Sequence, residues 1–578
     1  MIDIKENPRL NRLNHSCAHV LAQAVKRIYP QAKFWVGPVI SEGFYYDIDL
    51  GDITLKEEDL PAIEKEMKKI IKDGKRIFRE EISKAEALEL FKDDEYKLDL
   101  INNMNPDSTV ISIYKQAEFA DLCRGPHEDN VKACRYFKLL KVSGAYWKND
   151  ANNKMLQRVY GVCLSSKEEL EEHLNLLEEA KKSDHKKLGK ELELFMNSEF
   201  GPGFPFFLPK GMTVLKLLKD YWYEVHQQDY HFIQTPIMLS KELWETSGHW
   251  ANYRDNMYTS SIDEREFAIK PMNCPGGMLV YKNGLHSYKD LPLRIGELGL
   301  VHRHEASGAL NGLFRVRSFT QDDAHIFMTP DQIESEVVKL IGLIDKIYSQ
   351  FDLTYTIELS TRPTDKFIGD IATWDYSEKA LQNACQAAGK DFVINPGDGA
   401  FYGPKLDFKI KDSLGRIWQC ATIQLDANLP ERFDLTYIDS NGIRQRPVML
   451  HRAIFGSIER FLGILIEHYG GAFPLWLAPT QVVITPVHPE EHFEYSQKLQ
   501  QALEKEGIRV ELDNRNEKLG YRLREAQMKK VPYQLVIGDE EVANESVNIR
   551  LYGTKATVVK PMSEFVELIS ADNKNRIA

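Results

Sequence analysis

Two pairs of potential metal-binding or catalytic residues, each with members four residues apart, lie in the N-terminal part of the sequence. His15 and His19 lie in a stretch of helical periodicity, and Cys123 and His127 repeat the spacing in DLCRGPH. Side chains four apart share one face of a helix. If the fold unites both pairs, they either bind zinc or position and deprotonate water beside Asp121. Otherwise one pair is incidental.

A second group of residues surrounds a Gly-containing loop that follows VHRHE. Arg303 and Glu305 stand two apart at the end of an expected strand, so their side chains are predicted to share one face. Arg303 is suited to clamp a phosphate bidentately, and Glu305 can accept from a base amino group. The alternative is surface charge on a hairpin.

The far side of this loop and a distant helix add two more cations. We expect a second strand from Phe314, on which Arg315 could reach distal phosphates and Phe319 could stack on a purine. Arg460, in GSIERF, follows an apolar run and opens an apolar helix. It would bring a further cation to a strand–helix junction, unless it is a surface arginine at a helix end.

The composition limits what kind of protein must position these groups. The chain has 578 residues, 43% hydrophobic and 28% charged, typical of a folded protein of several domains. Its 74 Lys+Arg and 86 Asp+Glu give a net charge of −12, so nucleic acid would have to be bound by local patches. Seven scattered cysteines favour a reducing compartment, and no membrane-length apolar run is present. We therefore expect a cytoplasmic protein.

The elements divide the chain into four parts. Residues 1–164 mix strands and helices in an α+β domain, in which residues 44–50 alternate like a half-buried strand. Residues 165–195 are almost all helix formers, which predicts one connecting helix. Residues 196–475 alternate strands with longer helices and form the largest block. Residues 476–578 follow the order β-α-β-α-β of a small α/β domain.

Several long motifs resemble a known family. The Arg303-x-Glu305 segment resembles motif 2 of class II aminoacyl-tRNA synthetases, GSIERF resembles motif 3, and Gln234-Thr235-Pro236 with the helix before it resembles motif 1. KPMNCPG, HRHEASG, RVRSFTQDDAHIF and HRAIFGSIERF together resemble the threonyl-tRNA synthetases, over essentially the whole chain. That family usually begins with a small ubiquitin-like TGS domain, whereas this sequence starts at the editing domain.

The resemblance implies a fold and a division of labour. It implies an antiparallel-sheet catalytic core at 196–475, an editing domain at 1–164 and an anticodon-binding domain at 476–578. It implies ATP-dependent attachment of L-threonine to tRNA(Thr) through a threonyl-adenylate, with Mg²⁺ accompanying ATP. Motif 1 forms a dimer interface in this class, so a homodimer is expected.

The resemblance also assigns a zinc ion to three residues that are distant in sequence. Cys274, His325 and His451 fall on the zinc ligands of the family, and three protein ligands leave one position open. A site that engages the threonine hydroxyl can reject valine by about 10⁴–10⁵-fold. Asp323 would accept from that hydroxyl. The other expected pocket residues are Met272, Gln321, Tyr402 and Gln424.

Serine requires a second site, because it keeps the hydroxyl and lacks only a methyl group. A missing methyl is worth only about 10–200-fold in discrimination. The first cluster, of His15, His19, Cys123 and His127, resembles the family's editing site, which hydrolyses seryl-tRNA. We favour water activation by the histidines over a metal there. Asp121 and Lys97 would assist, as would Tyr45 or Tyr46.

The remaining roles follow the same resemblance. Arg303 would hold the α-phosphate, with Arg315 and Arg460 on the distal phosphates, and His249 would lie near the attacking ribose hydroxyl of tRNA. Glu541 and Arg550 would read the anticodon. The expected ATP-binding residues are Arg303, Glu305, Arg315, Phe319, Gln419 and Arg460, with Lys405 on a neighbouring strand.

Three other functions compete with this interpretation. A non-catalytic RNA-binding paralogue would carry damage at Arg303, Glu305, Arg460 or the zinc residues, and none is replaced here. A freestanding editing hydrolase would not need the long catalytic block. An unrelated ATP-dependent amino-acid ligase would not need an anticodon-type domain.

Overall fold

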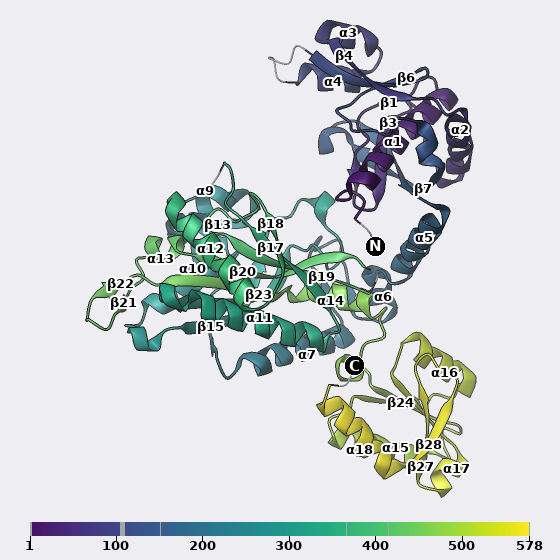
Figure 1. Cartoon of the computed structure of the whole chain (residues 1–578). Helices are drawn as coiled ribbons and strands as arrows, with labels where there is room; N and C mark the ends of the chain where they lie inside the picture. Colours follow the sequence, from purple (N-terminus) through teal and green to yellow (C-terminus); the bar gives the residue numbers. More distant parts are fainter. Residues whose placement is uncertain (1–2, 105–109, 151, 366, 414, 577–578) are drawn as a thin grey trace. The chain divides into compact units, whose positions relative to one another are not determined.

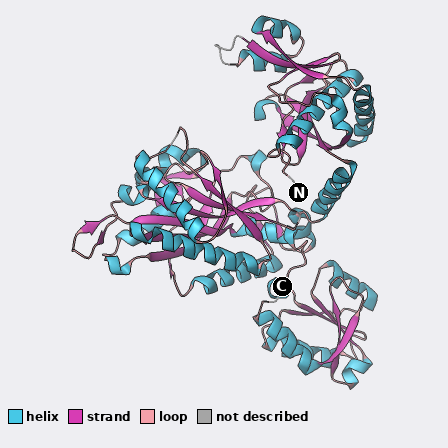
Figure 2. Ribbon diagram, in the orientation of Figure 1, coloured by secondary structure: helices cyan, strands magenta, loops and turns pink. Residues whose placement is uncertain are grey.

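A computed structural model describes residues 3–104, 110–150, 152–365, 367–413 and 415–576 (Figure 1). The chain divides into two compact units, Met1–Glu179 and Ala180–Ala578, each built from sheets covered by helices (Figure 2). Across the described ranges, no helix is both long enough and apolar enough to span a membrane.

The first unit is organised by helix α1 (Pro8–Ile28) on a sheet. Asn7 begins α1 by accepting from the backbone N–H groups of Arg9 and Leu10. The helix packs on β3 (Gly43–Asp49) and β8 (Met155–Leu164), and their apolar residues form one core. The sheet has the order β1-β3-β8-β7, with β2 paired to β3. The other strands are β1 (Lys33–Phe34), β2 (Val39–Ile40) and β7 (Tyr136–Tyr146).

The expected half-buried alternation of residues 44–50 is wrong, because β3 is buried on both faces. One face joins the apolar core through Phe44, Tyr46 and Ile48. The opposite face carries Asp47, which binds Arg158 with Oδ1 2.6 Å from Nε, and Asp49, which Lys154 covers. Ion-pair partners thus bury a face that the sequence pattern marks as polar.

A smaller antiparallel sheet completes the first unit. It consists of β4 (Ile77–Ser83), β5 (Val110–Gln116) and β6 (Phe119–Leu122), in that order. Strand β6 ends immediately before Cys123, so the sheet delivers that thiol to the end of a strand. Helix α2 (Leu60–Asp73) packs on α1.

The connecting segment is two helices rather than the single helix expected over 165–195. Helix α5 (Lys167–Lys182) stops before Ser183, and α6 (His185–Glu191) begins after it. The Asp184 side chain accepts from the backbone N–H groups of Lys186 and Lys187 and so caps α6. An aspartate that satisfies the first amides of a new helix favours a break over continuation.

An eight-stranded sheet forms the centre of the second unit. Its neighbours pair antiparallel except at the two ends, where β11 joins β15 and β17 joins β18 in parallel. Helices α7 (Pro209–His226), α11 (Ile333–Gln350) and α14 (Ile458–His468) contribute Leu and Ile side chains to its core. The strands, in spatial order, are β11 (His231–Phe232), β15 (Leu293–His302), β16 (Ser318–Met328), β23 (Val448–Ser457), β20 (Ile417–Asp426), β19 (Lys405–Lys411), β17 (Thr354–Ser360) and β18 (Phe392–Asn395).

The strand ends differ from expectation at the loop that carries the candidate phosphate ligands. Strand β15 stops at His302, so Arg303 and Glu305 lie beyond it, and β16 starts at Ser318 rather than near Phe314. Arg303 N–H still donates to the Arg317 carbonyl at 3.0 Å, which closes the loop. The predicted shared strand face is therefore wrong, and the loop itself orients these side chains.

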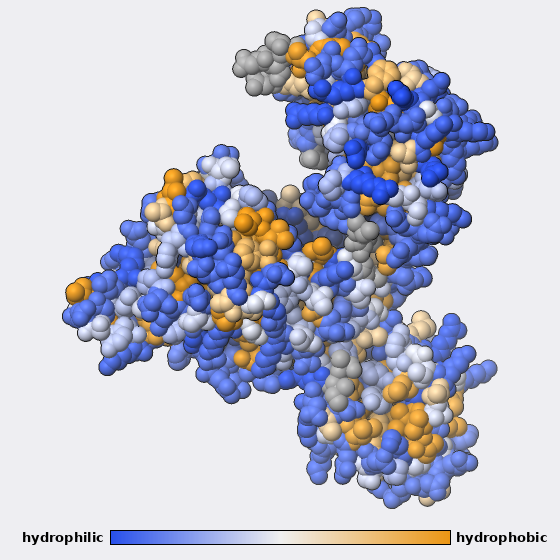
Figure 3. Space-filling model, viewed as in Figure 1, coloured by the Kyte–Doolittle hydropathy of each residue, from blue (hydrophilic) through white to orange (hydrophobic). Residues whose placement is uncertain are grey.

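The C-terminal part has the expected β-α-β-α-β order. Strand β24 (Val482–Pro486) pairs in parallel with β25 (Val510–Leu512) and β26 (Tyr533–Ile537), and helices α15 (Phe493–Lys505) and α16 (Leu519–Met528) connect them. Val482 and Ile484 face the core under α15 and α18 (Met562–Lys574), and Val483 faces α16. Strands β27 (Ser546–Leu551) and β28 (Thr557–Pro561) extend the sheet antiparallel. Apolar patches are visible on the surface of this domain (Figure 3).

Candidate functional site

Three elements of the second unit bring Cys274, His325 and His451 together. Cys274 is the first residue of α10 (Cys274–Lys282), and the register of β16 with β23 places His325 directly opposite His451. The donor atoms of the three side chains all lie within 4.8 Å of one another. The Nε2 atom of His325 is buried and has no hydrogen-bond partner among the described residues.

The chemistry of this group suits a zinc ion. Burial raises the pKa of the Cys274 thiol well above its usual value, so a thiolate there needs a cation beside it. Burial also lowers the pKa of His325 to about 4, which keeps the imidazole neutral and able to coordinate. Histidine nitrogen and cysteine sulfur are usual zinc ligands, and three protein ligands is the number found in catalytic zinc sites.

One carboxylate bonds a histidine of this group, and a second carboxylate lies near the other histidine. Asp426 Oδ2 lies 2.9 Å from His451 Nε2, and its Oδ1 accepts from the N–H groups of Asn428 and Leu429. Asp323 Oδ1 lies 3.8 Å from His325 Nε2. Carboxylates bonded to ligand histidines hold ring orientation and raise ligand basicity.

Several of the expected pocket residues lie beside this cluster. Gln424 is the register partner of His451 on β20, and its amide donates to the Gly403 carbonyl at 3.1 Å. The Tyr402 ring centre lies 5.3 Å from that of His451. His249 Nε2 lies 3.0 Å from the sulfur of Met272. The cluster therefore has a lining of aromatic, thioether and amide groups.

The candidate phosphate ligands lie on the loop and on α14. Arg303 Nε donates to the Pro271 carbonyl at 3.2 Å, and its guanidinium is 5.1 Å from the ring centre of Phe319. Arg315 Nε donates to Glu305 Oε2 at 2.8 Å, so these two residues satisfy each other. Arg460 Nε is buried and unpartnered within the described part of the chain. The loop therefore carries two of the three candidate guanidinium groups, and α14 carries the third.

The N-terminal cluster forms as its spacing suggested. His15, His19, Cys123 and His127 place their donor atoms within 4.8 Å of one another. Cys123 Sγ lies 3.2 Å from both His15 Nε2 and His127 Nε2. The short loop after β6 thus meets one face of α1, and neither pair is isolated.

An ion pair stands next to this cluster. Asp121 is 2.5 Å from Lys97 Nζ and 3.4 Å from His19 Nε2, and the Tyr46 hydroxyl donates to it. The Arg158 guanidinium instead lies over the Tyr45 ring, 3.9 Å from the centre of that ring. Of the two candidate tyrosines, Tyr46 is the one that reaches the cluster's partners.

Burial governs the protonation of these groups. Desolvation lowers the pKa of His15, His19 and His127, so the imidazoles are neutral near pH 7. It also raises the pKa of Cys123 to about 12, which keeps the thiol protonated. A neutral imidazole is able to accept a proton from water.

The matches to family models follow the domain order of the fold. Residues 258–469 match the tRNA synthetase class II core domain (G, H, P, S and T), and residues 481–572 match an anticodon binding domain. Residues 111–160 match the threonyl and alanyl tRNA synthetase second additional domain.

Known relatives cover almost the whole chain. The threonine–tRNA ligase of Fusobacterium nucleatum is 57% identical over 570 residues, which span 98% of this chain and 91% of that protein. That of Clostridium tetani is 53% identical over 591 residues, with 100% and 92% covered. The chain belongs to the threonine–tRNA ligase family. The resemblance of its motifs to threonyl-tRNA synthetases is confirmed.

Solved structures agree with this family and with the expected fold class. A crystal structure titled as the RNA binding domain of threonyl-tRNA synthetase from Cryptosporidium parvum is 40% identical, with a TM-score of 0.65. It covers 67% of this chain and 98% of its own. The predicted multidomain α+β architecture, with a class II core and a C-terminal α/β domain, is confirmed.

Two buried carboxylates of this threonine–tRNA ligase family member were missed by the sequence analysis. Asp322 accepts from the backbone N–H groups of Ile454, Phe455 and Gly456, where the register of β16 and β23 shifts. Burial raises the pKa of Asp322 to about 6. The sequence contained a signal for Asp322, because an acidic residue inside an apolar strand must be buried and must find hydrogen-bond donors.

Asp407, the second missed carboxylate, organises one wall of the same core. It accepts from Gln419 Nε2 at 2.6 Å and from Lys405 Nζ at 2.6 Å. Gln419 and Lys405, both singled out from the sequence, therefore meet on one buried group. Their side chains are held in place before any ligand arrives.

The candidate anticodon readers are partly occupied within the domain. Glu541 is buried, and its Oε2 accepts from Gly538 N–H at 2.9 Å as the cap of α17 (Asp539–Ala543). Arg550 Nε donates to the Thr554 carbonyl at 3.1 Å. Their role in reading RNA stays a prediction.

Proposed function

We propose that this chain couples L-threonine to tRNA(Thr) through a threonyl-adenylate and hydrolyses mischarged seryl-tRNA(Thr). The observation that carries the proposal is the convergence of Cys274, His325 and His451 beside Asp323, in the same core as the guanidinium groups of the class II motifs. The division into editing (1–164), connecting (165–195), catalytic (196–475) and anticodon-binding (476–578) parts belongs to this proposal.

Threonine selection depends on Asp323 and its neighbours. Asp323 accepts from the substrate hydroxyl, which valine lacks, and a buried carboxylate oxygen left without that donor then rejects valine by about 10⁴–10⁵-fold. Cys274, His325 and His451 would hold Zn²⁺, which supplies a Lewis-acid position for the amino and hydroxyl groups. The pocket wall is formed by Met272, Gln321, Tyr402 and Gln424.

Activation is mainly a matter of positioning charge. Arg303 binds the α-phosphate while Arg315 and Arg460 bind the distal phosphates, with Mg²⁺ accompanying ATP. Phe319 stacks on the adenine that Glu305 and Gln419 help to place. The threonine carboxylate attacks the α-phosphorus and pyrophosphate leaves. His249, next to Met272, lies near the ribose hydroxyl that then attacks the adenylate.

Editing uses the N-terminal cluster. His15, His19 and His127 are neutral imidazoles around one thiol, so one of them can take the proton of the attacking water. Lys97, in an ion pair with Asp121, stabilises the negative charge that develops on the substrate, and Asp121 helps to orient the imidazoles. Cys123 contributes a hydrogen-bonded thiol rather than a nucleophile, because its pKa is raised to about 12.

The remaining assignments concern partners. Glu541 and Arg550 are proposed to contact the anticodon, and the segment at Gln234-Thr235-Pro236 is proposed to form a homodimer interface. A cytoplasmic location is proposed as well, because ATP, threonine and tRNA are all found there.

The decisive experiment is amino-acid-dependent ATP–pyrophosphate exchange with threonine, serine and valine, before and after zinc chelation. We expect strong exchange with threonine, less with serine, almost none with valine, and loss on chelation that zinc restores. Deacylation of seryl-tRNA(Thr) by the same preparation tests editing. Absence of exchange in folded, metal-replete protein would instead favour an RNA-binding paralogue.

A further inference from the structure

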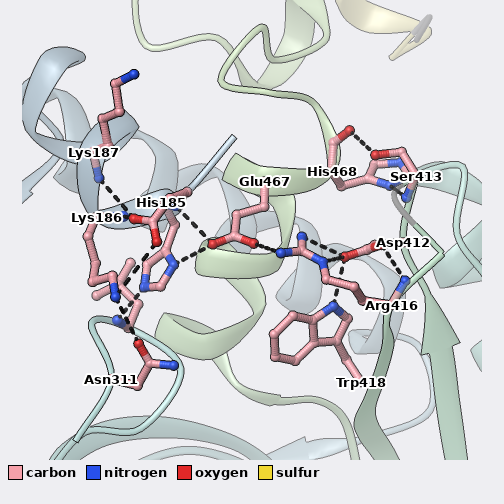
Figure 4. A network of polar contacts seen from close by, with 12 residues as sticks. His185, Lys186, Lys187, Asn311, Asp412, Ser413, Arg416, Trp418, Glu467 and His468 are labelled. Carbon is pink, nitrogen blue, oxygen red and sulfur yellow. Dashed lines mark hydrogen bonds and ion pairs between the residues drawn. The ribbon is translucent and has the colours of Figure 1, made fainter. Parts of the chain in front are cut away.

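A buried polar network lies behind the candidate ATP loop and contains none of the residues assigned above. His185, the first residue of α6, is 1% exposed at its side chain, and Glu467, in the last turn of α14, is 2% exposed. Glu467 Oε1 lies 2.6 Å from His185 Nδ1 and accepts from the His185 backbone N–H at 2.9 Å (Figure 4). The other carboxylate oxygen forms an ion pair with Arg416.

The network fixes which nitrogen of His185 carries the proton. The backbone N–H of Leu313 donates to His185 Nε2 at 3.0 Å. A backbone N–H is always a donor, so Nε2 must be the acceptor and Nδ1 must donate to Glu467. One imidazole therefore joins the connecting segment, α14 and the loop between β15 and β16, each through a directional bond.

The loop end that meets His185 is a tight turn over residues 311–315. Phe314 N–H donates to the Asn311 carbonyl at 2.8 Å, and Lys186 Nζ donates to the Asn311 side chain at 3.2 Å. A Cβ atom on Gly312 would come within 2.1 Å of His185 Nε2. The turn thus rests directly on α6, and Arg315 is its last residue.

Aromatic contacts connect His185 through Phe314 and Trp418 to Arg460 on α14. The Phe314 ring centre lies 4.0 Å from that of His185 and 4.3 Å from that of Trp418. The Trp418 indole donates to Asp412 at 2.9 Å, and Asp412 binds Arg416 (Figure 4). The Arg460 guanidinium lies 6.0 Å from the Trp418 ring centre. The network therefore backs both guanidinium groups assigned to the distal phosphates.

We propose that His185 is a positioning residue for ATP: by bonding Glu467 and Leu313 at once, it holds the turn that presents Arg315 and the Phe314–Trp418 stack beside Arg460. The inference rests on the proposed role of these arginines. It makes α6, near the start of the second unit, part of the support of the synthetic site. A shift of about 1 Å in such a loop is enough to change the rate about 10²-fold.

Two substitutions separate the two bonds of the imidazole. The amide nitrogen of His185→Asn reaches the place of Nδ1 and keeps the donor to Glu467, but leaves Leu313 N–H without an acceptor. The amide oxygen of His185→Gln reaches the place of Nε2 and keeps the acceptor for Leu313. Lys187→Ala is the matched control, because the Lys187 side chain on the same helix points away from the network (Figure 4).

The test measures KM for ATP and kcat in threonine-dependent exchange, with thermal unfolding of the full chain as a check on folding. We expect His185→Asn to raise KM for ATP about 10-fold and to change KM for threonine by less than about twofold. We expect KM for ATP of His185→Gln to stay close to that of the unmodified protein. Lys187→Ala should match the unmodified protein. If both His185 variants kept the KM for ATP of the unmodified protein and only their melting temperature fell, His185 would be a structural residue and the proposal would be overturned.

Arg315→Ala distinguishes this inference from the proposed function. If Arg315→Ala raises KM for ATP and the His185 variants do not, only the positioning role of His185 fails. If Arg315→Ala leaves KM for ATP unchanged, the assigned phosphate role fails and the positioning proposal fails with it.

Discussion

Two clusters of imidazole and thiol groups in this molecule have nearly the same ligand atoms and different surroundings. In the N-terminal cluster, the Cys123 thiol bonds two imidazoles, and Lys97 lies beside them in an ion pair with Asp121. In the catalytic core, Cys274 is buried among carboxylates, with Asp426 on one histidine and Asp323 near the other.

The difference lies in the charge of the neighbouring residues. Lys97, beside the N-terminal cluster, disfavours a second cation, and Cys123 Sγ there already bonds His15 and His127. Carboxylates around the other cluster favour a divalent ion, and His325 Nε2 has no other partner in the described ranges. We therefore propose water activation at the N-terminal cluster and metal binding at the other, although their ligand types are nearly the same.

The strongest test of this comparison removes the thiol of the catalytic cluster. Cys274→Ala should lower bound zinc and reduce threonine-dependent exchange by more than about 100-fold, because two histidines alone bind zinc poorly. Metal content by mass spectrometry and exchange rate are the measurements. Cys385→Ala, at a buried cysteine outside the cluster, is the control, and equal zinc content in both variants would contradict the assignment.

The corresponding change in the N-terminal cluster should affect only editing. His15→Ala should slow deacylation of seryl-tRNA about 100-fold, since it removes a proton acceptor, and leave threonine exchange unchanged. Asn11→Ala, one turn earlier on α1, serves as the control. If zinc content fell in His15→Ala, the two clusters would be alike and the comparison would fail.

A smaller effect is expected from the carboxylate that orients His451. Asp426→Asn keeps the shape of the side chain but weakens the bond to Nε2, so zinc affinity should fall about 10–100-fold. Competition with a chelator measures this change. Asp434→Asn, an exposed aspartate, should have no effect. An unchanged affinity in Asp426→Asn would show that the ligands need no orientation.

The smallest effect concerns the pH dependence of editing. Burial lowers the pKa of His15, His19 and His127, so in the folded protein they remain neutral as the pH falls through about 6.5. The deacylation rate should therefore change by less than about twofold as the pH falls from 8 to about 6.5. A rate that halves near pH 6.5 would mean that an ordinary, exposed histidine is the proton acceptor.

The lowered pKa values of these three histidines also make the free energy of unfolding depend on pH. Unfolding exposes these imidazoles and returns each pKa to about 6.5, so the unfolded chain binds more protons below that pH. Their contribution to the free energy of unfolding is full above pH 6.5 and falls as the pH decreases toward the folded values. Urea unfolding of the full chain at pH 7.5 and pH 5.5 measures it.

The sequence by itself determined the features that depend on local pattern. The spacing of His15 with His19 on a helix, the β-α-β-α-β order after residue 476 and the long motifs around Arg303 and Arg460 were all readable, and the family follows from them. Periodicity and capping act over a few residues, so they leave their mark in the chain order.

Only the tertiary structure decided what lies between distant segments. It ended β15 before Arg303, divided residues 165–195 at the Asp184 cap, and buried β3 on both faces with Arg158 and Lys154. It also brought His185 onto Glu467, 282 residues away. Such contacts depend on which strands and helices pack together, and a buried polar group finds its partner only when that packing has removed it from water.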